Sequence, residues 1–102
     1  MKKRQNPEPG RKARALLAAN VAELMARHRD WAGSQRKLGE RAKVAGRSIG
    51  YMLDPEEANP SLDNVAKVAA AFGIPVWQLF HPDLPTAAEA EVFAAFIRTS
   101  RK

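Results

Sequence analysis

The sequence predicts an all-α fold, and three observations carry this prediction. Apolar residues recur at three- and four-residue steps in several segments, as Leu17, Val21 and Leu24 do in the first of them. Serines in N-capping positions and helix-ending glycines or prolines stand between these segments. No segment requires a strand to explain its pattern. A chain of 102 residues suffices for one domain with a modest core.

The first third of the chain predicts an arm, a helix and a break. Residues 1–10 contain two prolines, which disfavour regular structure, so we expect a flexible basic arm. Residues 11–29 have the apolar spacing of a helix. The segment Asp30-Trp31-Ala32-Gly33 should end it, with Gly33 using the conformational freedom of glycine. We expect Trp31 to lie over the edge of the core.

The middle of the chain predicts two short helices joined by a tight turn. Ser34 is a suitable N-cap for a helix over residues 35–43. A turn over residues 44–46 leads into a further helix over residues 47–53. Asp54-Pro55 ends that helix, because the residue before a proline is disfavoured in the α region.

Two more helices follow a loop over residues 55–60. Ser61 caps a helix over residues 62–72, and Gly73 fits the position just after its end. Pro75 suits the first position of a short fifth helix over residues 75–80. The helix before it should bury one apolar stripe, formed by Leu62, Val65, Val68, Ala69 and Phe72.

The last segment predicts one extra C-terminal helix. Thr86 and Glu89 have the spacing of a capping box and open a helix that runs to about Arg98. One face of this helix is apolar and carries Val92, Phe93, Phe96 and Ile97. We interpret this face as a dimer contact. Packing on its own subunit and contact with another protein are the alternatives.

These elements divide the chain into three parts. The parts are the arm (residues 1–10), a five-helix domain (residues 11–81) and the C-terminal helix (residues 82–102).

Charge is distributed unevenly along the chain. Residues 1–53 carry 13 Lys and Arg against 4 Asp and Glu, a balance of +9, whereas residues 54–102 carry 4 against 7, a balance of −3. A strongly basic front half favours a polyanion partner. A soluble basic protein without such a partner is the alternative.

Composition excludes several classes of function. The chain has no cysteine, hence no disulfide and no thiolate metal site. No apolar run approaches the 18 residues of a membrane span, and the N-terminus does not have the pattern of a signal peptide. His28 and His81 lack partners at metal-ligand spacing, and no catalytic arrangement is recognisable. We therefore expect neither a metal nor a cofactor, and no enzyme activity.

Gly39 is the most informative residue of the central unit, residues 34–53. Glycine inside a helix costs about 1 kcal/mol relative to alanine, so its presence there indicates a packing reason. Two helices that cross steeply need a small residue at the crossing. The residues expected in the core are Leu38, Ala42, Val44, Ile49 and Met52, and those expected outside are Arg36, Lys37, Glu40, Arg41, Arg47, Ser48 and Tyr51.

This unit resembles the helix-turn-helix of the phage repressor and Cro family, also called the XRE family. The matching pattern is Gln35-x-x-Leu38-Gly39-x-x-Ala42-x-Val44-x-x-x-x-Ile49-x-x-Met52. Downstream, Asn59-Pro60-Ser61-Leu62-Asp63-Asn64-Val65, Phe72-Gly73-Ile74 and Trp77-Gln78-Leu79-Phe80 resemble the fourth and fifth helices of that family. The resemblance covers about residues 16–80. Its motifs are weak singly and specific in their combined order and spacing.

The resemblance implies a five-helix repressor-like domain and a sequence-specific regulator that binds double-stranded DNA. It favours a phage- or prophage-type repressor that occupies a two-fold symmetric operator as a homodimer, in the cytoplasm of a bacterial or phage-infected cell. The rival interpretation is an antitoxin that neutralises a toxin through the C-terminal helix and regulates its own operon. RNA binding is less well supported, because no exposed aromatic stacking platform is evident.

The second helix of such a unit lies in the DNA major groove, which defines the candidate base contacts. Arg47 can pair with a guanine edge through two hydrogen bonds, and Tyr51 follows one turn later. Gly46 matches the first base-facing position, where the family often has a long polar residue. The alternatives are a phosphate contact or a solvated side chain for Arg47, and a Tyr51 half-buried against the first helix.

Further residues are candidate phosphate contacts. By resemblance, Gln35 and Ser48 match positions that contact the DNA backbone. Ser34 lies at a helix N-terminus, where an anion is favoured, although N-capping is its stronger interpretation. Non-specific phosphate contacts are expected from Arg36, Lys37 and Lys43, and a neutral donor from Asn59 or Asn64. Lys43 also stands where the family has a glycine at the turn, so a left-handed lysine should cost about 1 kcal/mol.

Two charged segments have open roles. The basic residues of the arm and the start of the first helix could track the DNA backbone or could serve as a solubilising tail. They are Lys2, Lys3, Arg4, Arg11, Lys12 and Arg14. The acidic loop after the candidate recognition helix, with Asp54, Glu56 and Glu57, would repel phosphate. We therefore expect it to point away from the duplex.

Overall fold

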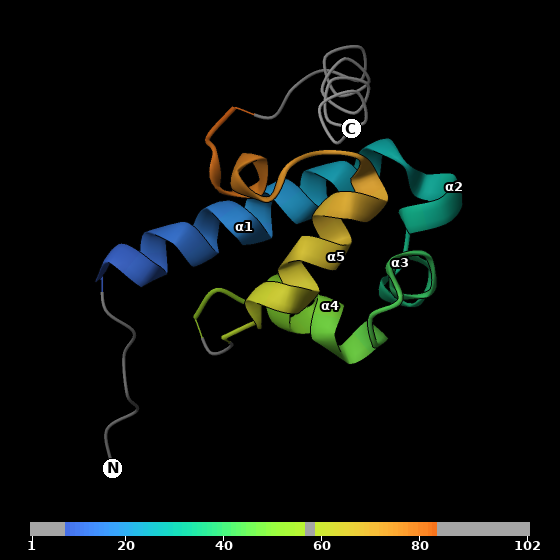
Figure 1. Ribbon diagram of the computed structural model, residues 1–102, viewed down its shortest axis with the longest axis horizontal. Helices are drawn as coiled ribbons and strands as arrows, with labels where there is room; N and C mark the ends of the chain where they lie inside the picture. The colour runs from blue at the N-terminus through green and yellow to red at the C-terminus, as the bar shows by residue number, and fades with distance from the viewer. Residues whose placement is uncertain (1–7, 57–58, 84–102) are drawn as a thin grey trace, which may run out of the picture.

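The computed structural model describes residues 8–56 and 59–83, and within them the protein is all-α with no strand (Figure 1). This confirms the predicted fold class. The predicted arm and the predicted C-terminal helix, with Val92, Phe93, Phe96 and Ile97, lie outside the described residues, apart from Glu8, Pro9 and Gly10. The elements are α1 (Glu8–Arg27), α2 (Arg29–Ala32), α3 (Gln35–Ala42), α4 (Gly46–Met52), α5 (Leu62–Phe72) and the 3-10 helix η1 (Val76–Phe80).

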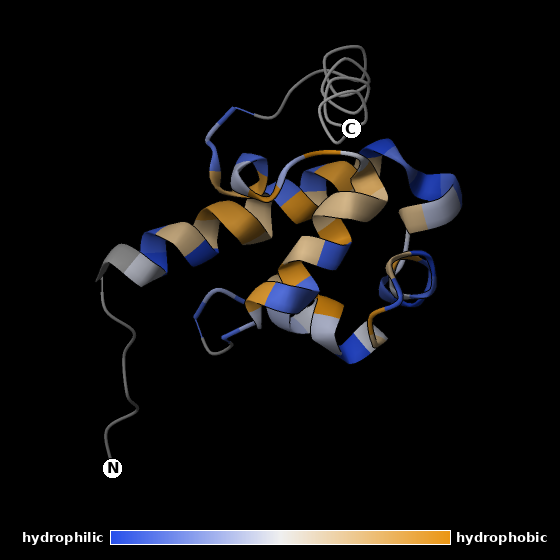
Figure 2. Ribbon diagram, in the orientation of Figure 1, coloured by the Kyte–Doolittle hydropathy of each residue, from blue (hydrophilic) through white to orange (hydrophobic). Residues whose placement is uncertain are grey.

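One core holds these helices together. Hydrophobic residues concentrate in α1 and α5, whereas α3 is largely hydrophilic (Figure 2). Every element supplies at least one side chain with 1% or less of its surface exposed; these are Leu17, Val21, Ala32, Leu38, Ile49, Met52, Val68, Ala69 and Leu79. The predicted core of the central unit, with Leu38, Ala42, Val44, Ile49 and Met52, is therefore confirmed. No helix in the described segments is long and apolar enough to span a bilayer.

The first helix departs from its predicted bounds at both ends. It begins at Glu8, three residues before the predicted start, because Pro9 falls in the first turn, where its missing N–H needs no partner. It ends at Arg27, and the predicted break is itself the short helix α2. The chain changes direction at His28 alone (φ −125°, ψ 55°), and the His28 carbonyl already accepts the Ala32 N–H at 2.7 Å.

Gly33 does not use the backbone freedom that was predicted for it. Its φ is −75°, an ordinary right-handed conformation, so that prediction is wrong. The requirement for glycine is steric instead. A Cβ atom at this position would lie 2.4 Å from the Arg29 carbonyl oxygen, which no side chain can tolerate. Trp31 does pack against the core, with its ring centroid 5.0 Å from that of Phe72, as predicted.

In the second half of the domain, the helix caps and helix ends lie close to their predicted positions. Ser61 accepts the Asn64 N–H at 3.1 Å and so caps α5, and Gly73 adopts the left-handed conformation (φ 74°) after it. Leu62 is a wrong core assignment, since it is 69% exposed. As the first residue of α5, it lies a full turn before Val65, where the buried stripe begins. The predicted fifth helix is a 3-10 helix, with Pro75 as its N-cap.

A buried asparagine fastens α1 to the end of η1. The Asn20 side-chain amide donates to the Leu79 carbonyl at 2.8 Å and to the His81 carbonyl at 2.7 Å. Nearby, the buried Gln78 amide donates to the Asp83 carbonyl at 2.9 Å. These amides supply donors to three backbone carbonyls at and after the end of η1. Asn20 lies on the same face of α1 as the apolar residues Leu17 and Leu24. A polar residue at such a position indicates a buried hydrogen bond, and this could have been recognised from the sequence.

Replacing Asn20 with alanine should lower the free energy of unfolding by about 2 kcal/mol, because one buried and one partly buried carbonyl lose their donor. Urea denaturation followed by circular dichroism measures this loss. Asn64→Ala is the matched control, since the described hydrogen bond of Asn64 is made by its backbone. A loss for Asn20→Ala no larger than for Asn64→Ala would show that the two bonds do not stabilise the fold.

Candidate nucleic-acid interface

The α3–turn–α4 unit depends on a close approach between backbones. Gly39 is buried in the middle of α3, and a Cβ atom there would lie 2.4 Å from the Val44 carbonyl oxygen and 3.2 Å from the Gly46 nitrogen. The Val44 N–H donates back to the Gly39 carbonyl at 2.9 Å. The predicted packing reason for Gly39 is therefore confirmed, and it is contact with the turn and the start of α4.

Lys43 ends α3 in the left-handed conformation, with φ 64° and ψ 43°. It is the one non-glycine residue with positive φ among those described. The strain predicted for this position is therefore present. A residue of the opposite hand lets the chain leave α3 sharply, which brings α4 across α3 within three residues.

The candidate recognition helix begins at Gly46, one residue earlier than predicted. Ala45 is its N-cap, and the Ala45 carbonyl accepts the Ser48 and Ile49 N–H groups at 2.9 and 3.3 Å. Ile49 and Met52 face the core and are almost fully buried. The other face is open: Arg47 is exposed, Tyr51 is 48% exposed and Ser48 is partly exposed.

Gly46 and Gly50 differ sharply from Gly39 in the space around them. A Cβ atom on Gly46 would meet its nearest neighbours, backbone atoms of Gln35 and Arg36, at 3.7–3.8 Å, an ordinary contact. The fold therefore does not demand glycine at the first predicted base-facing position. A Cβ atom on Gly50 would lie 3.0 Å from the Gln35 side-chain oxygen, so the Gln35 amide lies over α4.

Five of the candidate phosphate residues lie on α3 or at its ends; they are Ser34, Gln35, Arg36, Lys37 and Lys43. At its start, the Ser34 hydroxyl accepts the Lys37 N–H at 3.1 Å, so the N-capping interpretation of Ser34 is confirmed. Lys37 is exposed beside it, and Lys43 is exposed at the other end. Asn59 is exposed in the loop before α5, away from this unit in the sequence.

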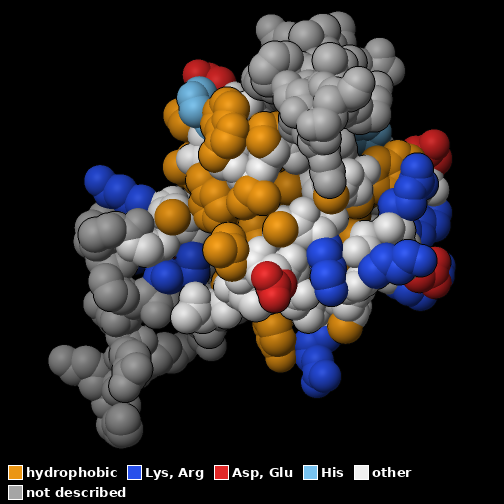
Figure 3. Space-filling view, viewed as in Figure 1, with side chains coloured by type: hydrophobic (Ala, Val, Ile, Leu, Met, Phe, Trp, Pro, Cys, Tyr) orange, Lys and Arg blue, Asp and Glu red, His pale blue; other side chains and the backbone are white. Residues whose placement is uncertain are grey.

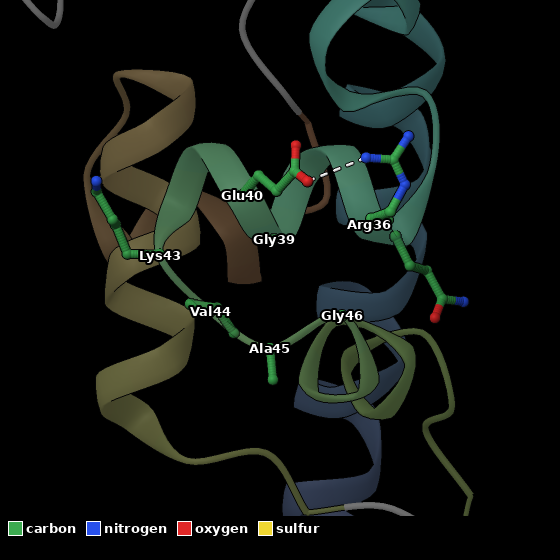
Figure 4. Close-up of a pocket in the computed structure, with 8 residues that line it drawn as sticks. Arg36, Gly39, Glu40, Lys43, Val44, Ala45 and Gly46 are labelled. Atoms are coloured by element: carbon green, nitrogen blue, oxygen red, sulfur yellow. Dashed lines mark hydrogen bonds and ion pairs between the residues drawn. The ribbon is translucent and has the colours of Figure 1, made fainter.

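A shallow groove of about 590 Å³ separates the outer face of α3 from the start of α4 (Figure 4). The Arg36 and Glu40 side chains form an ion pair along this groove, with 3.0 Å between Nη1 and Oε2. Both side chains are largely exposed, at 72% and 67%. The groove is lined by Gln35, Arg36, Gly39, Glu40, Lys43, Val44, Ala45 and Gly46.

Arg41 belongs to a different face of α3. Its guanidinium carbon lies 4.6 Å from the centre of the Trp31 ring, a cation–π contact. Trp31 in turn packs against His28 and Phe72, with ring centroids 5.3 and 5.0 Å away. Arg41 is thus directed toward α2 and away from the groove. The linear sequence contains no signal for this pairing, because the residues belong to separate elements.

The acidic loop after α4 faces α1. The Arg11 Nη2 atom lies 3.2 Å from the Glu56 carboxylate, and the Arg14 Nε–H donates to the Pro55 carbonyl at 3.1 Å. Two of the cations grouped with the basic arm therefore belong to α1 and hold the α4–α5 loop. The Glu56 carboxylate is matched by a cation of its own subunit.

The two histidines of the described segments make ring and backbone contacts. No three His, Cys, Asp or Glu side chains gather there as metal ligands. The His28 ring lies 5.7 Å from that of Phe72, and His81 Nδ1 accepts the Asp83 N–H at 3.1 Å. On the visible surface, Lys and Arg side chains lie along the right side and at the bottom, where α2, α3 and α4 lie, and others lie at the left beside α1 (Figure 3).

Comparisons of this chain with protein-family models, with curated protein sequences and with solved structures found no match.

Substituting Gly39 and Gly46 with alanine should have opposite effects on stability. Gly39→Ala should lower the free energy of unfolding by at least about 2 kcal/mol, because the new methyl group meets the rigid Val44 carbonyl. Gly46→Ala should raise it by a few tenths to about 1 kcal/mol, since alanine is the better helix former and space is available. Chemical denaturation of both variants measures the difference. Equal stability of the two variants would contradict the close approach at Gly39.

Relieving the strain at Lys43 should stabilise the fold. We expect Lys43→Gly to raise the free energy of unfolding by about 0.5 kcal/mol, because the cost of the left-handed lysine outweighs the extra freedom of glycine in the unfolded chain. Lys67→Gly, in the exposed middle of α5, should instead lower it by about 1 kcal/mol. Thermal melts of both variants test this, and a loss of stability in Lys43→Gly as large as in Lys67→Gly would overturn it.

Proposed function

We propose that the protein is a sequence-specific regulator that binds double-stranded DNA and inserts α4 into the major groove. The observation that carries the proposal is the split of α4 into two faces: Ile49 and Met52 are buried, while Arg47 and Tyr51 stand exposed one turn apart. The major groove is about 12 Å wide and accepts an α-helix with its side chains. The close approach at Gly39 holds α4 rigidly against α3.

Arg47 is the strongest candidate for direct base readout. It lies in the first turn of α4, is exposed, and makes no ion pair with any described residue. A guanidinium can donate two parallel hydrogen bonds to guanine O6 and N7, which is the commonest specific contact in the major groove. Tyr51 lies one turn further along the same face and would reach a thymine methyl group or a phosphate.

The surroundings of α4 suit the sugar-phosphate backbone. Lys37 and the capped start of α3 lie on one side, and Lys43 lies at the far end of α3. Such contacts fix the orientation of the protein on the duplex without reading sequence. The balance of +9 over residues 1–53 favours the same partner and predicts strongly salt-dependent binding.

The proposal includes a phage- or prophage-type repressor role, with two copies bound to a two-fold symmetric operator. Its support is the resemblance to the repressor and Cro family. In such dimers, two recognition helices lie about 34 Å apart, one turn of DNA. The predicted dimer face, with Val92, Phe93, Phe96 and Ile97, lies outside the described residues.

Arg47→Ala should lower affinity for a DNA site selected by the wild-type protein about tenfold or more, and it should relax the preference at one base pair. Gel shifts and fluorescence anisotropy measure both quantities. Arg41→Ala is the matched control, because it removes the same charge from an arginine that is directed toward Trp31. If the two variants lost affinity equally and kept the wild-type preference, Arg47 would not read a base.

A further inference from the structure

Glu40 is the single carboxylate among the residues that line the groove between α3 and α4. Arg36 and Lys43 line the same groove, and Arg47 follows its last lining residue, Gly46. Figure 4 shows the Glu40 side chain between Lys43 and Arg36, turned toward Arg36. An acid in this position faces the surface on which the proposed function places polyanionic DNA.

The ion pair between Glu40 and Arg36 contributes little to the stability of the fold. Both partners are more than two-thirds exposed, they belong to the same helix one turn apart, and exposed pairs of this kind contribute little to stability. The pair also affects Arg36. A guanidinium 3.0 Å from a carboxylate has part of its charge offset and one of its N–H donors engaged, so it attracts a phosphate less strongly than a guanidinium without such a partner.

We infer that Glu40 determines specificity by weakening sequence-independent binding. The inference rests on the proposed function and adds a regulatory role for one residue of that site. The Glu40 carboxylate engages the Arg36 guanidinium and repels the phosphate backbone. Both effects lower the affinity of the protein for any duplex. A correct site compensates through base contacts, and an incorrect site does not. The ratio of specific to non-specific affinity is therefore higher than it would be with a neutral residue at position 40.

The test compares Glu40→Gln with Glu23→Gln in the full chain. Glu23 forms the same type of pair, with Arg27 at 3.1 Å, on α1 outside the groove. Both variants change the net charge equally, so a difference between them reports the position of the charge. The probes are a mixed-sequence duplex of about 30 base pairs and a duplex selected by the wild-type protein, each titrated between about 50 and 200 mM salt.

Glu40→Gln should bind the mixed-sequence duplex about two- to fivefold more tightly than Glu23→Gln. Its plot of log affinity against log salt should be steeper by about one, the change expected for one additional phosphate contact. The ratio of specific to non-specific affinity should fall. In an Arg36→Gln background, the same Glu40→Gln change should have a smaller effect, because it then removes only the direct repulsion between Glu40 and phosphate.

Three outcomes would overturn the inference. Equal behaviour of Glu40→Gln and Glu23→Gln would show that the groove position is irrelevant. An undiminished effect in the Arg36→Gln background would show that Glu40 does not act through Arg36. A loss of affinity for the selected duplex confined to one cytosine would show that Glu40 reads a base instead. A wild-type protein that binds neither duplex would contradict the proposed function itself, which is a distinguishable result.

Discussion

The contact on which the rest of the structure depends is the approach of the Gly39 α-carbon to the Val44 carbonyl. No side chain fits there, since a Cβ atom would lie 2.4 Å from the oxygen. This contact lets α4 cross α3 immediately after a three-residue turn. Lys43 adopts a left-handed conformation in that turn. Burial of Leu38 and Ile49 on the inner side offsets the cost of this strain.

The same contact determines what remains outside. With Ile49 and Met52 committed to the core, the helical period of α4 leaves Arg47 and Tyr51 on the opposite face. Likewise, burial of Leu38 and Ala42 fixes which face of α3 is turned toward the core, so that Arg36 and Glu40 line the groove. The proposed readout by Arg47 and the proposed role of Glu40 are therefore both consequences of how the two helices pack.

Local signals in the sequence predicted the elements well. The caps at Ser34 and Ser61, the left-handed residues Lys43 and Gly73, and the bounds of α5 all follow from interactions within a few residues. The predictions were wrong where one residue type has two possible local roles. Gly33 is required by a steric contact at ordinary φ, and Pro9 is tolerated within a first turn.

Pairings between separate elements could not be predicted in this way. The bonds from Asn20 to residues 79 and 81, the Arg41–Trp31 contact and the Arg11–Glu56 pair each join distant or differently oriented segments. The candidate site shows the same division. Its residues could be named from the pattern, but the Arg36–Glu40 pair along the groove and the space beside Gly46 emerge from the packing of α3 and α4.

Selection from a pool of random DNA duplexes by the wild-type protein tests sequence-specific binding without any assumption about the target. We expect enrichment of one short motif, repeated with two-fold symmetry and with half-sites about 10 base pairs apart, one turn of DNA. A pool whose sequences remain random after repeated rounds would contradict sequence-specific binding.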